Sequence, residues 1–121
     1  EIVESLDSVR EPFNSNSLGQ VAALAALEDQ AHVQRAVILN GSEKTRLAAE
    51  LLRRGLEVLP SLANFLCVDL GRDAAPVFGR LLDRGVIVRP LRAYALPNAL
   101  RVSVGTADEN ATFLAALDAA L

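Results

Sequence analysis

The stretch RPLRAYALPNALRVSVGT, residues 89–106, decides how the C-terminal part of the chain folds. Short apolar runs at 86–88 and 100–104 lie on either side of a proline-containing loop and predict two strands. Arg89 closes the first run, and Arg101 lies at the start of the second. A guanidinium at a strand end offers planar, paired N–H donors that suit a carboxylate or a phosphate. We therefore expect Arg89 and Arg101 to converge as an anion clamp; the alternative is two solvated charges at strand ends.

The other apolar patterns predict an α+β domain, an α/β two-layer sandwich in which helices cover one face of a small mixed or antiparallel sheet. The strands are too few for a doubly wound sheet. Asn16 or Ser17 is suited to cap the second helix, and Asn40 and Gly41 are suited to interrupt the third. Gly55 is suited to end the third helix, Gly85 to end the fourth, and Asp108 to cap the last. The periodicity predicts helices at 1–10, 17–27, 29–55, 73–84 and 108–121, strands at 57–59, 64–70, 86–88 and 100–104, and an extended connector at 12–16.

Composition limits the class of protein. The chain has 121 residues, 51% of them hydrophobic and 22% charged, which is typical of one soluble globular domain. A net charge of −3 and only four Phe and one Tyr disfavour nucleic-acid binding. Cys67 is alone, so it cannot form an internal disulfide, and His32 cannot build a metal site unaided. No apolar run approaches the length of a membrane span, and we expect a cytoplasmic protein.

Several motifs together carry a family resemblance. The ordered set resembles the C-terminal part of the fold-type I aminotransferases that use pyridoxal phosphate, specifically the histidinol-phosphate aminotransferase group. It covers nearly the whole chain but only the last third of such an enzyme. The resemblance implies connecting helices from a larger domain at 1–30 and the small C-terminal domain at 31–121. The motifs are VREPFNSNSLGQVAALAAL (9–27), PSLANFLCVDL (60–70), RGVIVRPL (84–91), YALPNALRVSVGTADEN (94–110) and FLAALDAAL (113–121).

The resemblance also implies residue roles. Arg101 corresponds to the arginine that closes over the acidic group of the substrate. Arg89 matches a second arginine near the anionic end, a phosphate in the histidinol-phosphate enzymes. Asn64 resembles the polar residue placed near the cleft, although holding the backbone at a strand start is an equal alternative. Tyr94 lies between the arginines and is a candidate substrate contact or a plain surface residue. The resemblance gives structural roles to Arg10, Pro12, Phe13 and Asn14.

The cofactor machinery of the family is not recognisable in this sequence. Pyridoxal phosphate needs a Schiff-base lysine, and the only lysine is Lys44, within a predicted amphipathic helix. Nothing around Lys44 supplies the desolvated pocket or cationic neighbour that activates such a lysine, and no glycine-rich phosphate loop precedes a helix. We therefore expect this chain to be a fragment of a longer protein. The chain also begins at Glu1 without an initiator Met, which supports the same expectation. The fragment should bind no pyridoxal phosphate and be inactive alone, whereas the resemblance implies a parent protein that holds the cofactor and forms a homodimer.

Three functions remain open at this level. The first is a domain of a transaminase that moves an amino group between glutamate or 2-oxoglutarate and an amino acid or phosphorylated amino alcohol, most simply in histidine biosynthesis. Within it, another substrate or a decarboxylase of the same family is an alternative. The second is a stand-alone α+β module that binds a small acid through the same arginines. The third is a structural oligomerisation piece in which residues 22–27 pack against a second copy.

Overall fold

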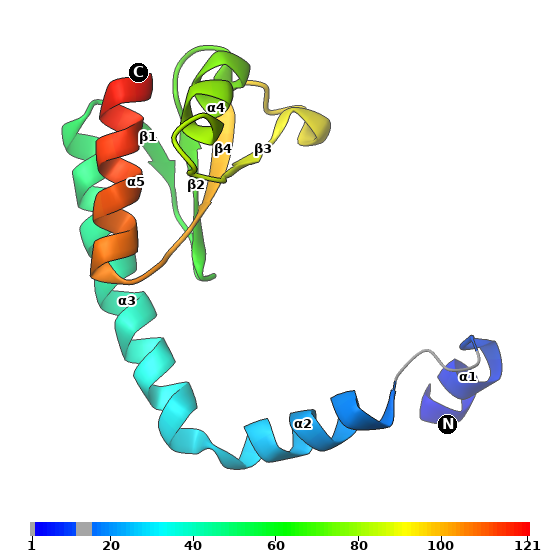
Figure 1. Cartoon of the computed structure of the whole chain (residues 1–121). Coiled ribbons are helices and arrows are strands. Elements are labelled where there is room, and N and C mark those ends of the chain that lie inside the picture. The colour runs from blue at the N-terminus through cyan, green and yellow to red at the C-terminus, as the bar shows by residue number, and fades with distance from the viewer. Residues whose placement is uncertain (1, 12–15) are drawn as a thin grey trace. The chain divides into compact units, whose positions relative to one another are not determined.

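The chain divides into two units, residues 1–35 and residues 36–121, and each is described by itself. The computed structural model describes residues 2–11 and 16–121 (Figure 1). The predicted connector at 12–16 lies outside the described residues except for Asn16, and so do the structural roles expected of Pro12, Phe13 and Asn14.

The first unit is helical. It contains α1 (Ile2–Val9), α2 (Ser17–Glu28) and the first residues of α3 (Gln30–Arg53). Asn16, one of the two predicted caps, begins α2, because its side-chain oxygen accepts the N–H of Gly19 at 2.6 Å. Neither α1 nor α2 has a buried residue. Their exposed apolar side chains are Ile2, Val3, Leu6 and Val9 in α1 and Leu18, Val21, Leu24 and Leu27 in α2.

The second unit carries the sheet. The predicted interruption of α3 at Asn40 and Gly41 is wrong, because the helix runs through both residues. One interior glycine costs only about 1 kcal/mol, which a helix of this length tolerates.

The second unit contains residues 36–53 of α3, then β1 (Glu57–Leu59), β2 (Phe65–Asp69), α4 (Ala74–Leu82), β3 (Arg89–Pro90), a 3-10 turn (Arg92–Tyr94), β4 (Ala99–Ser103) and α5 (Ala107–Ala120).

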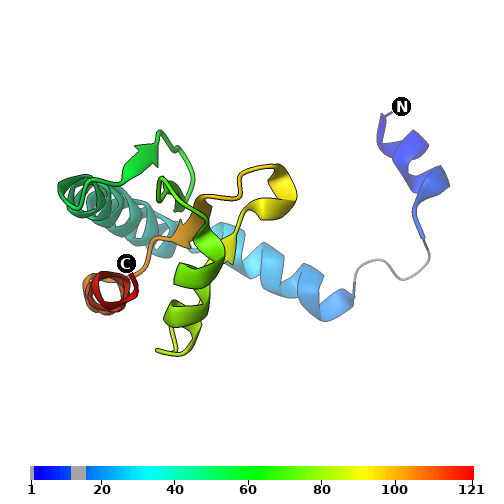
Figure 2. The ribbon, with the colours of Figure 1, turned by 90° about the horizontal axis from the view of Figure 1, so that it is seen from above.

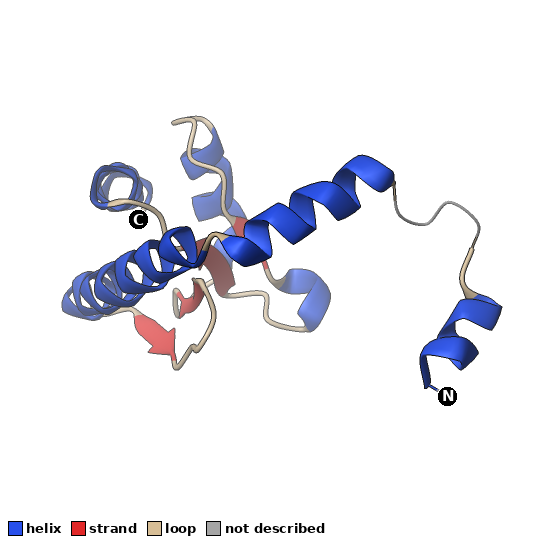
Figure 3. Ribbon diagram, turned by 90° about the horizontal axis from the view of Figure 1, so that it is seen from below, coloured by secondary structure: helices blue, strands red, loops and turns tan. Residues whose placement is uncertain are grey.

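The four strands form an antiparallel sheet in the order β1-β2-β4-β3. Residues 36–53 of α3 lie together with α4 and α5 on one side of it (Figures 2 and 3). This arrangement confirms the predicted two-layer α+β fold. Side chains alternate across a sheet, so Leu66 of β2 and its partner Val102 of β4 share the buried face. The core joins these residues to Leu47 and Leu51 of α3, Val77 and Leu81 of α4, and Phe113, Leu114 and Leu117 of α5.

One predicted strand is misplaced. Residues 86–88 are not a strand, and β3 is only Arg89 and Pro90, which pair with Arg101 and Leu100. A hollow lined by residues 86–88 on one side and residues 102–104 on the other separates the segment from β4. The ladder therefore ends at Arg89. Val86 and Val88 are half-buried and Ile87 is 81% exposed, so the side chains of this apolar run alternate in burial as in a strand, but the segment lacks the hydrogen bonds of one.

The predicted cap of the last helix is also wrong. Thr106, not Asp108, begins α5. The Thr106 backbone N–H donates to Glu109 Oε2 at 2.7 Å, and the Glu109 backbone N–H donates to Thr106 Oγ1 at 3.4 Å. This reciprocal pair is a capping box, which satisfies two backbone donors at once, so it outcompetes a single Asp108 cap.

Glycines end α3 and α4 in the same way. Gly55 has φ +76° and Gly85 has φ +74°, the left-handed conformation that other residues adopt at a cost. In each case the residue after the glycine donates its N–H five residues back, to Leu51 O in α3 and to Leu81 O in α4. Both helix ends are therefore as the sequence predicted.

In the part of the chain that the structure describes, no helix combines the length and the apolar character required to cross a membrane.

Candidate functional site

Arg89 and Arg101 are direct cross-strand neighbours. The register of β3 and β4 pairs them with each other. Directly opposed residues of an antiparallel pair project from the same face, so both side chains leave the sheet on one side. That side is opposite to the helix-covered face, which carries Leu100 and Val102. The structure thus brings the two predicted arginines together.

Neither arginine is neutralised by a carboxylate of the described residues. Arg101 places its guanidinium carbon 5.1 Å from the centre of the Phe65 ring, and Arg89 lies 5.9 Å from that of Tyr94. Arg89 also makes a long hydrogen bond of 3.5 Å to the Tyr94 hydroxyl. The other described arginines of the second unit use their donors elsewhere: Arg46, Arg53, Arg54 and Arg92 pair with carboxylates, and Arg72, Arg80 and Arg84 bind backbone carbonyls.

A guanidinium that rests on a ring face keeps its in-plane N–H donors available. Two such groups side by side repel each other, and a bound anion would relieve that repulsion. The chemistry that this arrangement supports is recognition of a carboxylate or phosphate, with bidentate hydrogen bonds as the strongest mode.

The other two predicted site residues, Tyr94 and Asn64, differ in whether they lie beside the two arginines. Tyr94 is 61% exposed and touches Arg89, so the structure brings it into the cluster. Asn64 is exposed, and its carbonyl accepts the N–H of Val104 at 2.9 Å, which fixes the start of β2. Asn64 lines a hollow of about 320 Å³ together with residues that include Asn40 and Thr106, and neither Arg89 nor Arg101 lines that hollow. The structure does not bring Asn64 into the arginine cluster.

Sequence reasoning missed Phe65. It lies on β2, where its register partner is Ser103, two residues beyond Arg101 on β4. This diagonal relation across strands brings an aromatic side chain within reach of an arginine. The signal is the aromatic residue directly after Asn64, but it has meaning only once the register is known.

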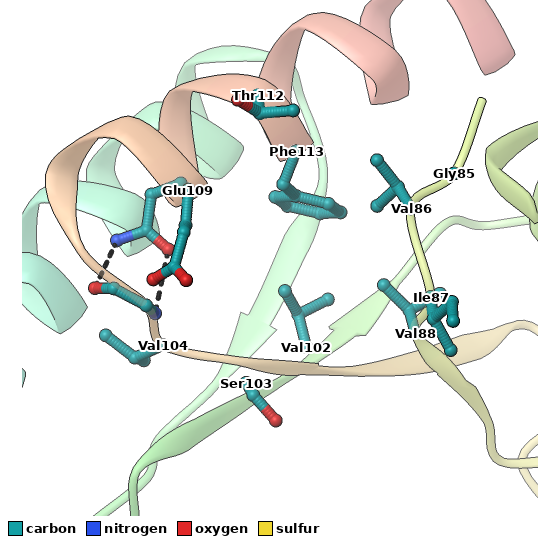
Figure 4. Close-up of a pocket in the computed structure, with 12 residues that line it drawn as sticks. Gly85, Val86, Ile87, Val88, Val102, Ser103, Val104, Glu109, Thr112 and Phe113 are labelled. Atoms are coloured by element: carbon teal, nitrogen blue, oxygen red, sulfur yellow. Dashed lines mark hydrogen bonds between the residues drawn. The ribbon is translucent and has the colours of Figure 1, made fainter.

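A larger hollow, of about 540 Å³, is lined by neither arginine (Figure 4). Phe113 and Val102 face Val86 across it. Its one carboxylate, Glu109, is already held by the Thr106 backbone N–H and hydroxyl, which keep the Glu109 pKa below its ordinary value. Polar and apolar groups line it in similar share, and neither Arg89 nor Arg101 is among the lining residues. This hollow therefore lacks the charge needed to hold an anion.

A buried polar cluster fixes the turn after β4. Glu43 and Asn110 are the two buried polar residues of the described chain. Glu43 Oε2 accepts from Arg46 Nη2 at 2.6 Å and from Asn110 Nδ2 at 2.8 Å. The hydrogen bond from Arg46, and after it the one from Asn110, lower the pKa of Glu43 and outweigh desolvation, which would raise it. Asn110 also binds both backbone groups of Gly105 at 3.0 Å, so the cluster ties α3 to the end of the Arg101 strand.

Comparison with known proteins identifies the family. The sequence pattern of "Aminotransferase class I and II" matches residues 1–117. The chain belongs to the class I and II aminotransferases. The resemblance found in the sequence is thereby confirmed.

Among relatives of this aminotransferase chain, histidinol-phosphate aminotransferase 2 of Methylococcus capsulatus is 52% identical over 121 residues, which are 100% of this chain and 33% of that protein. The histidinol-phosphate aminotransferase of Symbiobacterium thermophilum is 48% identical, again over 100% of the chain and 34% of the relative. The chain thus spans about one third of the length of these curated relatives.

Solved aminotransferase structures agree. Histidinol-phosphate aminotransferase from Sinorhizobium meliloti, solved in complex with pyridoxal-5'-phosphate, matches with a TM-score of 0.85 and 30% identity, over 97% of this chain and 33% of that one. The enzyme from Clostridium acetobutylicum has a TM-score of 0.87 and 22% identity, over 98% and 37%, which shows the shared fold.

The described residues of this aminotransferase chain do not fit covalent attachment of pyridoxal phosphate. The only lysine, Lys44, donates through Nζ to the carbonyls of Ser61 at 2.9 Å and Ala63 at 3.1 Å. It therefore fastens the loop before β2 to α3, and a structural role explains its position. The described residues also contain no group of three or more His, Cys, Asp or Glu that could hold a metal ion.

Proposed function

We propose that the chain is the C-terminal domain of a longer pyridoxal-phosphate-dependent aminotransferase, and that Arg101 and Arg89 bind the anionic part of its substrate. The observation that carries this proposal is the cross-strand pair of guanidinium groups whose donors no described carboxylate occupies. The identities to histidinol-phosphate aminotransferases favour histidinol phosphate and 2-oxoglutarate, or glutamate in the reverse direction, as substrates.

In this proposal the two parts of the chain have different tasks. Residues 1–30 connect to a larger upstream domain, and residues 31–121 form the small domain that recognises substrate. The exposed apolar side chains of α1 and α2 support the first assignment, since a stable protein covers such surfaces. The upstream domain would hold the cofactor, which supplies the electron sink for amino-group transfer. We place the parent protein in the cytoplasm as a homodimer formed mainly through that domain.

The arginines act by binding and orientation. Arg101 would bind an acidic group that both substrates present in turn, and Arg89 would lie nearer the phosphate. Each charge-assisted hydrogen bond contributes about 1.5 to 3 kcal/mol, so losing one arginine should lower kcat/KM about 10- to 150-fold. Tyr94 would hold Arg89 in place, and Asn64 remains a candidate contact from the adjacent strand start.

The test uses the full-length protein and compares Arg101→Ala, Arg89→Ala and the control Arg84→Ala, whose exposed side chain binds only the Arg80 carbonyl. Steady-state kinetics are measured with histidinol phosphate and with histidinol, each against 2-oxoglutarate. We expect Arg84→Ala to match the wild type and Arg101→Ala to lose at least tenfold in kcat/KM. Arg89→Ala should lose activity on histidinol phosphate more than on histidinol. If both site variants stay within twofold of the wild type on every substrate, the proposal is wrong.

A further inference from the structure

Arg89 and Arg101, on the face of the sheet that the helices leave open, share one kind of support. Each guanidinium contacts an aromatic ring rather than an acid, Phe65 beneath Arg101 and Tyr94 beneath Arg89. The Arg101 contact is the closer of the two, and Phe65 is half-buried whereas Tyr94 is mostly exposed. Phe65 therefore provides the more rigid support.

The geometry of β2 and β4 sets this contact. Cys67 is the register partner of Arg101 and Phe65 that of Ser103, so Phe65 and Arg101 are diagonal neighbours on the same face. Both are half-buried, which restricts the rotamers of the long arginine side chain. A restricted side chain loses less conformational entropy when it binds a ligand.

The chemistry of the support matters as much as its rigidity. In the same domain Arg92 donates to the carboxylate of Asp73 at 2.8 Å, so a bound anion would have to displace that acid. A ring attracts the guanidinium through its face and leaves the edge donors free. Phe65 holds Arg101 while leaving its charge and its N–H groups available.

We propose that Phe65 is a positioning residue for substrate recognition, acting through Arg101 by aiming its guanidinium at the anion. This inference rests on the proposed function, in which Arg101 binds the substrate. Phe65 itself needs no contact with the substrate. Because the contact orients a group that binds the substrate, its loss should weaken binding more than it slows turnover.

The test is a double-mutant cycle in the full-length protein with Phe65→Leu, Arg101→Ala and the double variant. Phe65→Tyr is the conservative control, because it keeps the ring, and Phe65→Met is a second removal in case the leucine variant does not fold. KM and kcat are measured for histidinol phosphate and 2-oxoglutarate, with thermal unfolding of each variant. Phe65→Leu should raise KM about 3- to 10-fold, as expected for a cation–π contact, with kcat changed less than twofold. Phe65→Tyr should restore wild-type KM.

The coupling decides between positioning and a merely structural role. If Phe65 acts through Arg101, Phe65→Leu has no further effect on KM once Arg101 is alanine. The inference would be overturned if Phe65→Leu raised KM equally in the wild-type and Arg101→Ala backgrounds. It would also be overturned if KM were unchanged in Phe65→Leu and Phe65→Met while Arg101→Ala was impaired. Either result would leave the proposed function standing. Wild-type kinetics of Arg101→Ala would instead overturn the proposed function, and this inference with it.

Discussion

Replacing Asn110 by alanine should severely destabilise the domain. The side chain is 2% exposed and joins three elements, since it accepts from the Gly105 N–H and donates to the Gly105 carbonyl and to Glu43 of α3. Alanine removes all three hydrogen bonds. It also leaves two half-buried backbone groups of Gly105 without the partner that Asn110 supplies, which is the costly half of losing a hydrogen bond.

The magnitude follows from the three contacts. Two bonds to neutral backbone groups contribute about 1 kcal/mol each, and the bond to a carboxylate about 1.5 to 3 kcal/mol. Alanine is the better helix former by about 0.6 kcal/mol, which offsets part of the loss. The net destabilisation is about 3 to 4.5 kcal/mol, a large share of the 5 to 15 kcal/mol typical of a domain.

Urea unfolding followed by tyrosine fluorescence measures this loss. The chain has one tyrosine and no tryptophan, and Tyr94 lies in the second unit, so the signal does not mix with melting of α1 and α2. With a slope of about 1.5 kcal/mol/M, the midpoint should fall by about 2 to 3 M.

Thr112→Ala is the matched control. Thr112 lies on the same helix, is exposed, and donates only to the Asp108 carbonyl at 2.9 Å. Its loss should change the free energy of unfolding by less than about 0.5 kcal/mol. A destabilisation below about 1 kcal/mol for Asn110→Ala would refute the reasoning, because the turn after β4 would then be held by other contacts.

Two further predictions concern the same domain. Gly85→Ala should destabilise the domain by about 1 kcal/mol, because φ of Gly85 is +74°. Gly79→Ala should stabilise it by about 0.5 to 1 kcal/mol, because Gly79 lies inside α4 with nothing within 4 Å of the added Cβ. Urea midpoints of the two variants that move in the same direction would contradict this. The hydrogen bond from Arg54 holds the pKa of Asp118 below its ordinary value, so the stabilisation by their ion pair is present above the unfolded-state pKa and lost as pH falls through the folded-state pKa. The stability difference between wild type and Asp118→Asn should therefore be largest near pH 7 and shrink in acid; a difference that is constant from pH 7 to pH 3 would count against the pair.

Local signals in the sequence were sufficient for most of the fold. The apolar run around Phe65 predicted β2, and Gly55 and Gly85 predicted two helix ends, because each of these depends on a few adjacent residues. The start of α5 was mispredicted although its signal is local: Thr106 and Glu109 have the spacing of a capping box. Asp108 was a competing cap that the sequence alone did not exclude.

The remaining errors depend on contacts between distant segments. Residues 86–88 have the composition of a strand, but they lie unpaired beside a hollow that residues 102–104 also line, and no local pattern encodes that hollow. The neighbouring positions of Arg89 and Arg101 were expected from the loop that joins them. The contact of Arg101 with Phe65 was not expected, because the two residues lie 36 positions apart in the sequence and meet only through the register of β2 and β4.

The position of Lys44 has a practical consequence. A protease that cleaves only after lysine finds one such bond in this chain, between Lys44 and Thr45, and that bond lies inside α3. The ammonium group that the enzyme must recognise is meanwhile engaged with the carbonyls of Ser61 and Ala63. Cutting therefore requires α3 to open and release this side chain, so the rate at which fragments 1–44 and 45–121 appear reports directly on how often the domain loosens around its longest helix.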